Sequence, residues 1–265
     1  MKIEGTMKKM RTEYAVPVQY FLPIGNKELH LNEVIGSDLT LEATGTINCI
    51  RCGKPTKNSF AQGYCYQCFI SAPETEECVL RPELCRAHEG IARDMEFAHK
   101  YCLIQHFVYL AMTPQLKVGV TRNTQIPTRW IDQGADRAIR LAVTPNRYIA
   151  GIIEVALKQL FSDKTNWRKM LSGTIYSEID LQHEKWKVEE LLPLDLRAYF
   201  CEEDDITHLV YPVTSFPNKI KSIDLEKQKN LKGRLTGIKG QYLIFESGEV
   251  MNIRKFGGYY IQVEI

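Results

Sequence analysis

HFVYLAMTPQLKVGVTR, residues 106–122, is the stretch that is most informative about the fold. Two short apolar runs flank the Thr-Pro-Gln sequence at 113–115, and this pattern predicts two strands joined by a turn. The next segment, IPTRWIDQGADRAI, predicts a short helix that ends at Gly134, followed by a strand from Ile139 to Val143. The central region therefore begins as strand, strand, helix, strand.

A longer helix is predicted directly after this strand. Asn146 suits the position before its first turn, because an asparagine side chain accepts hydrogen bonds from the unpaired N–H groups at a helix start. The following apolar residues recur every three or four positions, as one stripe of a helix does. They are Ile149, Ile152, Ile153, Ala156, Leu157, Leu160 and Phe161. Shorter helical pieces are expected at 166–171 and, with an acidic character, at 178–192.

Upstream of this region, the segment CIRCGKPTKNSFAQGYCYQC contains two C-x-x-C pairs. Each pair can turn back so that both thiolates face one ion, and Gly53 and Gly63 suit the tight turns beside them. Four thiolates close a tetrahedral structural zinc site and leave no position for catalysis. The alternatives are a redox C-x-x-C and four chance cysteines, but two pairs at this spacing favour zinc. The predicted ligands are Cys49, Cys52, Cys65 and Cys68.

A second segment, CVLRPELCRAHEGIARDMEFAHKYC, predicts another zinc site. One cysteine and one histidine lie three residues apart, close enough to share an ion, and two more cysteines would join them. The alternative is a group of buried thiols, which are common in protein cores. His99 and His106 are further ligand candidates, and Cys201 is left over. The predicted ligands of the second zinc are Cys78, Cys85, His88 and Cys102.

The cysteines also help to predict the cellular compartment of the protein. The N-terminal residues mix charged side chains and contain no apolar core of signal-peptide length. No run approaches the roughly 18 uncharged apolar residues that a membrane span needs. We therefore expect a cytoplasmic protein, in which the thiols of the eight cysteines stay reduced and bind metal rather than form disulfides.

The two ends of the chain are predicted to be rich in strands. Residues 15–47 alternate apolar and polar side chains, and 231–265 reads as four short strands with turns at Ser247-Gly248 and Gly257-Gly258. We expect an α+β protein whose β-rich ends pair with each other into one small barrel or sheet. The predicted segments are an N-terminal β-rich region (1–47), a cysteine-rich zinc-binding region (48–104), a central domain (105–175), an acidic helical segment (176–205) and a C-terminal β-rich region (206–265).

The central domain resembles a GIY-YIG nuclease domain in its order of elements. More closely, nearly the whole chain resembles an uncharacterised bacterial family that joins cysteine-rich segments to the strings VYLA, KVGVTR, TRWIDQGA and DKTNWRKML. The nuclease resemblance implies a GIY-YIG-like α/β unit with metal-dependent endonuclease activity. In that family, water attacks a phosphodiester with the help of one divalent ion, which a glutamate holds.

The resemblance also implies roles for particular residues. Tyr109 matches the tyrosine of the first-strand motif, Arg129 matches the arginine of the first helix, and Glu154 matches the glutamate that holds Mg²⁺ or Mn²⁺. Two positions depart from the family. Lys117 replaces the tyrosine of the second strand, and Gln133 stands where the helix usually has a histidine or tyrosine. A desolvated lysine can act as a base, so this departure is compatible with catalysis. The candidate catalytic residues are Tyr109, Lys117, Arg129 and Glu154.

Charge is distributed unevenly, although 34 Lys+Arg nearly balance 32 Asp+Glu. Ten basic and four acidic residues between Lys117 and Lys169 give +6, and the stretch from Lys219 to Lys239 carries +5. Residues 178–205 carry −7. A basic surface that contains one carboxylate suits a phosphodiester ligand with a metal ion. The candidate nucleic-acid-binding residues are Arg122, Gln133, Arg147, Lys164, Asn166 and Arg168, of which Asn166 matches an asparagine of the nuclease family.

Three functions are compatible with these patterns. The first is a zinc-containing nucleic-acid-binding protein, for DNA or RNA, with divalent-metal-dependent phosphodiesterase activity. The second is a non-catalytic module that binds RNA, DNA or a ribonucleoprotein through a degenerate nuclease fold. The third is a protein-interaction adaptor whose acidic residues 178–205 meet a basic partner. Taken without the family, Glu154 is expected to be a solvated glutamate paired with Lys158, four residues later.

Overall fold

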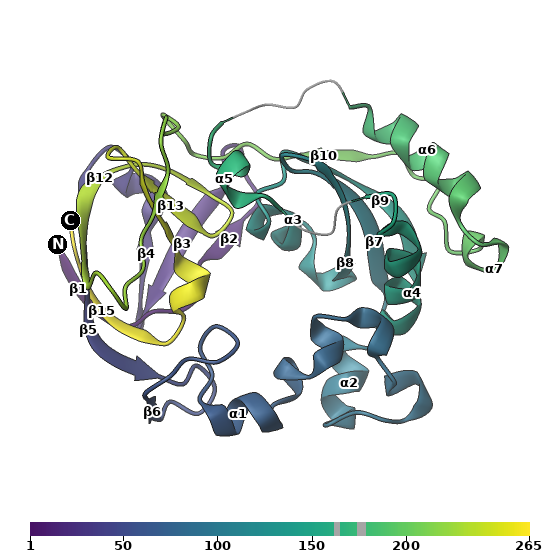
Figure 1. Ribbon diagram of the computed structural model, residues 1–265, viewed down its shortest axis with the longest axis horizontal. Coiled ribbons are helices and arrows are strands. Elements are labelled where there is room, and N and C mark those ends of the chain that lie inside the picture. Colours follow the sequence, from purple (N-terminus) through teal and green to yellow (C-terminus); the bar gives the residue numbers. More distant parts are fainter. Residues whose placement is uncertain (162–164, 174–178) are drawn as a thin grey trace. The chain divides into compact units, whose positions relative to one another are not determined.

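A computed structural model describes residues 1–161, 165–173 and 179–265 (Figure 1). The chain divides into two compact units. The first comprises Met1–Ile70, Leu171–Gly173 and Leu209–Ile265, and the second comprises Ser71–Met170 and Thr174–His208. The five segments expected from the sequence are shorter than these units, and that finer division stays a prediction.

Both ends of the chain contribute to one large sheet in the first unit. Its strands lie in the order β1-β15-β5-β12-β13-β14-β11, with β6 paired to β5. The first strand pairs antiparallel with the last, with Ile3 opposite Val263, so the predicted pairing of the β-rich ends is confirmed. The strands are β1 Lys2–Thr6, β5 Asp38–Asn48, β6 Pro55–Thr56, β11 Lys221–Ser222, β12 Asn230–Lys239, β13 Tyr242–Phe245, β14 Glu249–Asn252 and β15 Tyr259–Glu264.

This sheet is open, so the expectation of a barrel was wrong. Among the described residues, its path runs from β1 at one edge to β11 at the other. The long strand β12 changes partner along its length: residues 230–234 pair with β5, and residues 235–239 pair with β13. The edge strand β11 has only two residues, both exposed, and it pairs with β14 alone. Because β1 and β11 do not pair with each other in the described part of the chain, the sheet keeps two edges.

A smaller sheet of three strands completes the β structure of the first unit. It runs β2-β3-β4, with β2 Arg11–Glu13, β3 Gln19–Ile24 and β4 Lys27–His30. In β3, Tyr20, Leu22 and Ile24 are fully buried while the residues between them are partly exposed. This alternation is the period of two that the sequence predicted for the region. The helix α1, Tyr66–Ser71, follows the first group of cysteines.

The second unit is built on a four-stranded antiparallel sheet in the order β10-β9-β7-β8. The strands are β7 His106–Met112, β8 Leu116–Arg122, β9 Arg137–Thr144 and β10 Ile206–His208. The helices are α2 Met95–Tyr101, α3 Thr128–Asp132, α4 Arg147–Leu157, α5 Trp167–Met170, α6 Leu181–Leu191 and α7 Leu194–Arg197. The predicted order of strand, strand, helix, strand, helix is therefore confirmed, and the mixed content confirms the α+β class.

Helix α4 packs on this sheet through the first part of the predicted apolar stripe. The helix ends at Leu157, and Leu160, which the predicted stripe included, is exposed. The Asn146 side chain accepts a hydrogen bond from the N–H of Ile149 at 3.0 Å, as the capping prediction requires. Ile153 and Leu157 are buried in one core with Val108 and Val118 of the sheet. Burial of each such side chain contributes about 1.5–3 kcal/mol. Helix α4 is thus held firmly enough to position the polar side chains on its other faces.

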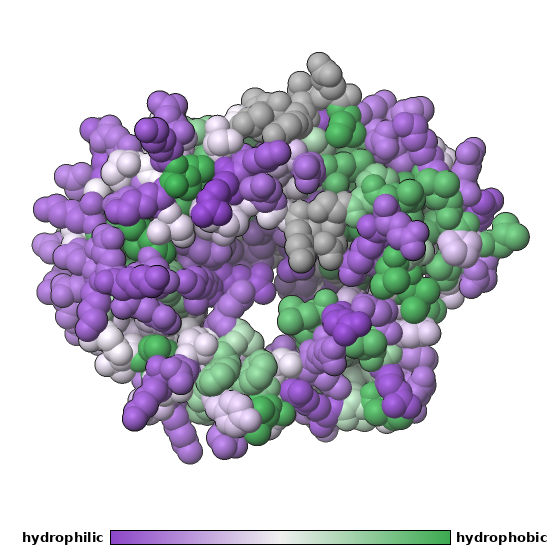
Figure 2. Space-filling model, in the orientation of Figure 1, coloured by the Kyte–Doolittle hydropathy of each residue, from purple (hydrophilic) through white to green (hydrophobic). Residues whose placement is uncertain are grey.

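The outer surface of this region is partly apolar. In Figure 2, hydrophobic side chains gather over α4 and α7, where Val155 of α4 and Leu194 of α7 are exposed. Elsewhere, the face shown is predominantly hydrophilic. Within the described ranges, we find no helix with the length and apolar character needed to cross a membrane.

Candidate metal centres and candidate active site

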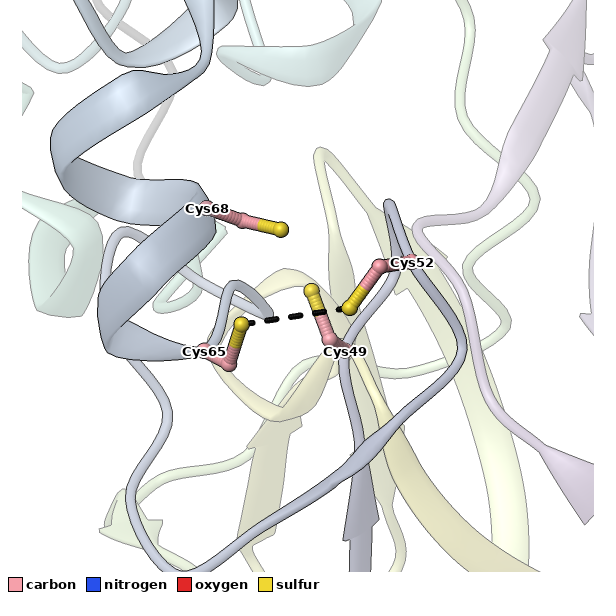
Figure 3. Close-up of side chains that lie close together, drawn as sticks. All are labelled: Cys49, Cys52, Cys65 and Cys68. Carbon is pink, nitrogen blue, oxygen red and sulfur yellow. Dashed lines mark hydrogen bonds between the residues drawn. The ribbon is translucent and has the colours of Figure 1, made fainter.

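Four cysteines of the first unit point their sulfur atoms toward one another (Figure 3). Cys49 and Cys52 lie in the loop after β5, and Cys65 and Cys68 lie at the start of α1. All four Sγ atoms are within 4.8 Å of one another, with 3.9 Å between those of Cys52 and Cys65. A zinc ion about 2.3 Å from four tetrahedral sulfurs holds them about 3.8 Å apart. This four-cysteine cluster can therefore hold a metal ion.

Two tight turns shape the four-cysteine cluster. The N–H of Gly53 donates to the carbonyl of Cys49, and the N–H of Cys49 donates to the carbonyl of Lys54, both at 2.9 Å. Gly53 has a φ of +73°, which residues with a side chain rarely adopt. At Gly63, an added Cβ would lie 2.7 Å from the side chain of Ile50. The backbone thus requires both glycines that the sequence singled out.

The thiols of this cluster differ in acidity. Burial raises the pKa of Cys49, but backbone N–H groups of Cys52, Cys65 and Arg51 lower it, to about 6. Burial raises the pKa of Cys68, and its hydrogen bonds with the other three cysteines raise it further, to about 12. Four thiolates at this separation repel one another. A divalent cation removes this repulsion, so metal binding and proton release are coupled here.

Three cysteines of the second unit form another group, with sulfur atoms within 4.8 Å of one another. They are Cys78, Cys85 and Cys102, all buried. The fourth predicted ligand, His88, lies outside this three-cysteine cluster. Its ring stacks on Tyr148, with 4.3 Å between the ring centroids. The structure thus brings together three of the four residues predicted for the second site, and these three can hold a metal ion.

Arg147 closes one side of the three-cysteine cluster. Its Nη1 donates to the sulfur of Cys78 at 3.6 Å, its Nη2 to the carbonyl of Tyr101 at 3.2 Å, and its backbone N–H to the carbonyl of Cys102 at 2.8 Å. Because Arg147 is buried, it presents little guanidinium surface to a nucleic acid. Arg122 lies nearby, 4.6 Å above the Tyr101 ring. Burial and the charge of Arg147 lower the pKa of Arg122.

Tyr109, in β7, is linked to α3 by hydrogen bonds. Its side chain is fully buried, and its hydroxyl oxygen lies 2.9 Å from the side-chain amide of Gln133. With the amide oxygen toward Arg129, Gln133 accepts from Nε at 3.0 Å and from Nη2 at 3.2 Å. Burial raises the pKa of Tyr109, the Arg129 guanidinium lowers it, and the Glu154 carboxylate raises it. The residues matched to the nuclease motif therefore lie near one another.

Glu154, in α4, is 9% exposed rather than solvated. Lys158 Nζ lies 3.5 Å from its carboxylate, so the expected pair four residues apart does form. Burial raises the pKa of Glu154, Lys158 lowers it, Glu83 raises it, and Lys117 of β8 lowers it. Lys117 is itself buried. We call the following residues the Glu154 cluster: Tyr109, Lys117, Arg129, Gln133 and Glu154.

The remaining candidates for nucleic-acid binding lie around α5. Arg168 is exposed, and its guanidinium carbon lies 4.3 Å above the Trp167 ring. Asn166 is also exposed, and its side chain accepts a hydrogen bond from the N–H of Lys169 at 3.2 Å, which caps the helix. Lys164 lies outside the described residues. Only Arg168 thus offers a charge at the surface here among the predicted residues that the structure describes.

The sequence did not identify Glu83, whose charge acts on Glu154. Glu83 lies in the 3₁₀ turn Pro82–Leu84, which packs on α4. Its Oε1 accepts from Nε of Arg81 at 3.3 Å, whereas its Oε2 is buried with no hydrogen-bond partner among the described residues. The one signal in the sequence was Gly151, a glycine inside an apolar helix pattern, which often marks close packing.

Comparison with known proteins places the chain in a family. No curated protein and no solved structure matches it. Residues 36–261 match DUF2797, which is described as a protein of unknown function. The match includes both cysteine clusters and the Glu154 cluster, and it agrees with the family resemblance expected from the sequence. Because it spans most of the chain, this protein belongs to the DUF2797 family.

Proposed function

We propose that this protein binds nucleic acid, contains structural zinc, and hydrolyses phosphodiesters with a divalent metal ion at the Glu154 cluster. One observation supports the catalytic part most. Tyr109, Arg129 and Glu154 come from three different elements, β7, α3 and α4, yet the charges of Arg129 and Glu154 both act on Tyr109. Buried ionisable groups of both signs, brought together in this way, are typical of active sites.

Each residue of the Glu154 cluster has a role in this proposal. Mg²⁺ or Mn²⁺, bound by the Glu154 carboxylate, would supply Lewis-acid stabilisation of the phosphate charge. Lys117, in its neutral form, takes the proton of the attacking water, and Tyr109 orients that water by a hydrogen bond. Arg129, fixed by Gln133, stabilises the negative charge on the phosphate oxygens. A bond from the water oxygen to phosphorus forms, the bond to the leaving oxygen breaks, and that oxygen takes a proton.

Zinc has a structural role in the proposal. The four-cysteine cluster has a complete set of thiolates, which leaves no coordination position for a substrate. It joins the loop after β5 to α1, two short segments that bury few apolar side chains of their own. The three-cysteine cluster holds the segment around residues 78–102 against the start of α4 through Arg147. Zinc at the three-cysteine cluster would thus fix the start of the helix that contains Glu154.

A cleavage assay tests the catalytic part. The zinc-loaded protein is mixed with single- and double-stranded DNA and RNA, with Mg²⁺ or Mn²⁺ or with neither. We expect metal-dependent cleavage by the wild type and its loss in Glu154→Gln. The matched control is Glu190→Gln, which removes the charge of an exposed glutamate on α6 and should cleave as the wild type does.

A second candidate function is a binding module without catalysis. The observation in its favour is burial: Tyr109 is fully buried and Lys117 is 5% exposed, which limits contact of either side chain with a substrate. In that case the protein would bind nucleic acid with a steep dependence on salt, with no effect of Mg²⁺ or Mn²⁺ and no cleavage. The same assay, combined with a binding titration at several salt concentrations, separates the two functions.

A further inference from the structure

The turn that contains Glu83 lies directly on the helix that contains Glu154. Gly151 makes this approach possible, because a Cβ at this position would lie 2.2 Å from the backbone nitrogen of Glu83 and 2.4 Å from the carbonyl carbon of Pro82. Glu154 follows Gly151 by three residues, so both lie on the same side of α4. Because Gly151 has no side chain, the turn Pro82–Leu84 can pack on α4 one helical turn from Glu154.

The Glu83 carboxylate is incompletely paired in this position. Its side chain is 17% exposed. One oxygen, Oε1, accepts a hydrogen bond from Arg81, while Oε2 is buried and has no hydrogen-bond partner in the described part of the chain. A buried carboxylate oxygen without a partner is costly to the fold unless another group satisfies it. A bound cation would satisfy it.

The charge of Glu83 acts on the carboxylate of Glu154, which is also buried. Two carboxylates near one another in a site of low polarity repel, and a divalent cation between them turns this repulsion into attraction. Mg²⁺ and Mn²⁺ prefer oxygen ligands, and one or two carboxylates are their usual protein ligands. We propose that Glu83 and Glu154 together bind the divalent metal ion, so that Glu83 is a second carboxylate ligand of the site. This proposal rests on the proposed function.

The three-cysteine cluster positions Glu83 for this role. Cys78 precedes the turn and Cys85 follows it directly, so both ends of the segment that contains Glu83 are held at one point. The same cluster contacts the first residue of α4, Arg147. The turn and the helix that supply the two carboxylates are thus tied to each other at their ends. This arrangement links the cysteine-rich segment to the metal site as a positioning element.

Binding of Mn²⁺ to the zinc-loaded full chain, measured by electron paramagnetic resonance of the unbound ion, tests the proposal. We expect Glu83→Gln to weaken Mn²⁺ binding about tenfold or more, and Glu154→Gln to weaken it at least as much. The matched control is Glu77→Gln, because Glu77 is the other carboxylate paired with Arg81 and is exposed; it should bind Mn²⁺ as the wild type does. Circular dichroism and zinc content establish that each variant is folded.

The outcomes separate this proposal from the proposed function. If Glu83→Gln binds Mn²⁺ like the wild type while Glu154→Gln does not, the role of Glu83 is refuted and the Glu154 site stands. If both variants bind Mn²⁺ like the wild type, the site itself is refuted. Should Glu83→Gln fail to fold, Fe²⁺ replaces Mn²⁺ in the zinc-loaded wild type, and ascorbate with peroxide generates local backbone cleavage. Cleavage beside both residue 83 and residue 154 supports the proposal, whereas cleavage beside residue 154 alone refutes it.

Discussion

Tyr109 and Gly119 lie directly opposite each other in the β7–β8 ladder, and the tyrosine ring occupies the space that a side chain at 119 would need. A Cβ at Gly119 would lie 2.6 Å from the Tyr109 hydroxyl oxygen. The glycine at this position of β8 is thus explained by the tyrosine opposite it in β7. This pair sets the position of the hydroxyl that Gln133 contacts.

Replacement of Gly119 by alanine should therefore displace Tyr109. We expect the free energy of unfolding to fall by about 1–3 kcal/mol, because an added methyl group overpacks a filled site. Cleavage should fall as well, since the hydroxyl moves. Urea unfolding measures the first effect. Gly233→Ala is the control, because its Cβ would have no neighbouring atom closer than 3.4 Å; an equal loss of stability in both variants would show that the Tyr109 contact is not responsible.

The zinc content of cysteine variants should show separately whether each cysteine cluster binds a metal ion. We expect about two zinc ions per chain, and a loss of about one in Cys52→Ser, which removes one of four ligands. Cys85→Ser should lose the other. Mass spectrometry under native conditions distinguishes the species. Cys201→Ser is the control, because this buried cysteine belongs to neither cluster. A single zinc ion in the wild-type protein would show that only the four-cysteine cluster binds zinc.

Arg147 should stabilise the metal of the three-cysteine cluster without binding it. Three thiolates and Zn²⁺ carry one net negative charge, which the buried guanidinium balances. We expect Arg147→Met to weaken zinc binding there about 10- to 100-fold, the range observed for residues that contact metal ligands. Competition with a chromogenic chelator measures this. The exposed Arg168, changed to methionine, should leave zinc affinity unchanged; a similar effect of both changes would argue against local charge balance.

The ionised carboxylate of Glu154 should reduce the stability of the folded protein when no divalent metal ion is bound. Burial raises the pKa of Glu154 in the folded protein, so folding favours its protonated form. Its contribution to stability is therefore greatest below the unfolded pKa of about 4.3 and is lost as the pH rises through the raised folded pKa. We expect Glu154→Gln to melt at a higher temperature than the wild type near neutral pH, with the difference shrinking in acid. A lower melting temperature for the variant at neutral pH would contradict this assignment.

The sequence predicted best those features that depend on local spacing. The two C-x-x-C pairs specify their cluster because each pair needs only one turn, at Gly53 or before α1. The elements from β7 to α4 follow from short periodic patterns and from the asparagine cap at Asn146. The family was also predictable, because the strings that carry the resemblance are local motifs, and they lie within the matched residues 36–261.

Features that depend on tertiary contacts were not predictable in this way. Helical periodicity placed Glu154 away from the apolar stripe and suggested a solvated side chain, but the turn Pro82–Leu84 packs on α4 and the Glu154 side chain is buried. Likewise, the spacing of Cys85 and His88 permits a shared metal ion. The 3₁₀ turn Ala87–Glu89 instead presents the histidine ring to Tyr148. In each case, contact between segments distant in the sequence decided the outcome.

The most direct test of the central claim is metal-dependent cleavage of nucleic acid by the wild type and by Glu154→Gln, with zinc content and folding verified in both. The account predicts cleavage by the wild type only when Mg²⁺ or Mn²⁺ is present, and a loss of at least about a hundredfold in the variant. Cleavage by Glu154→Gln at the wild-type rate, or a wild type that cleaves no DNA or RNA substrate with either metal ion, would contradict it.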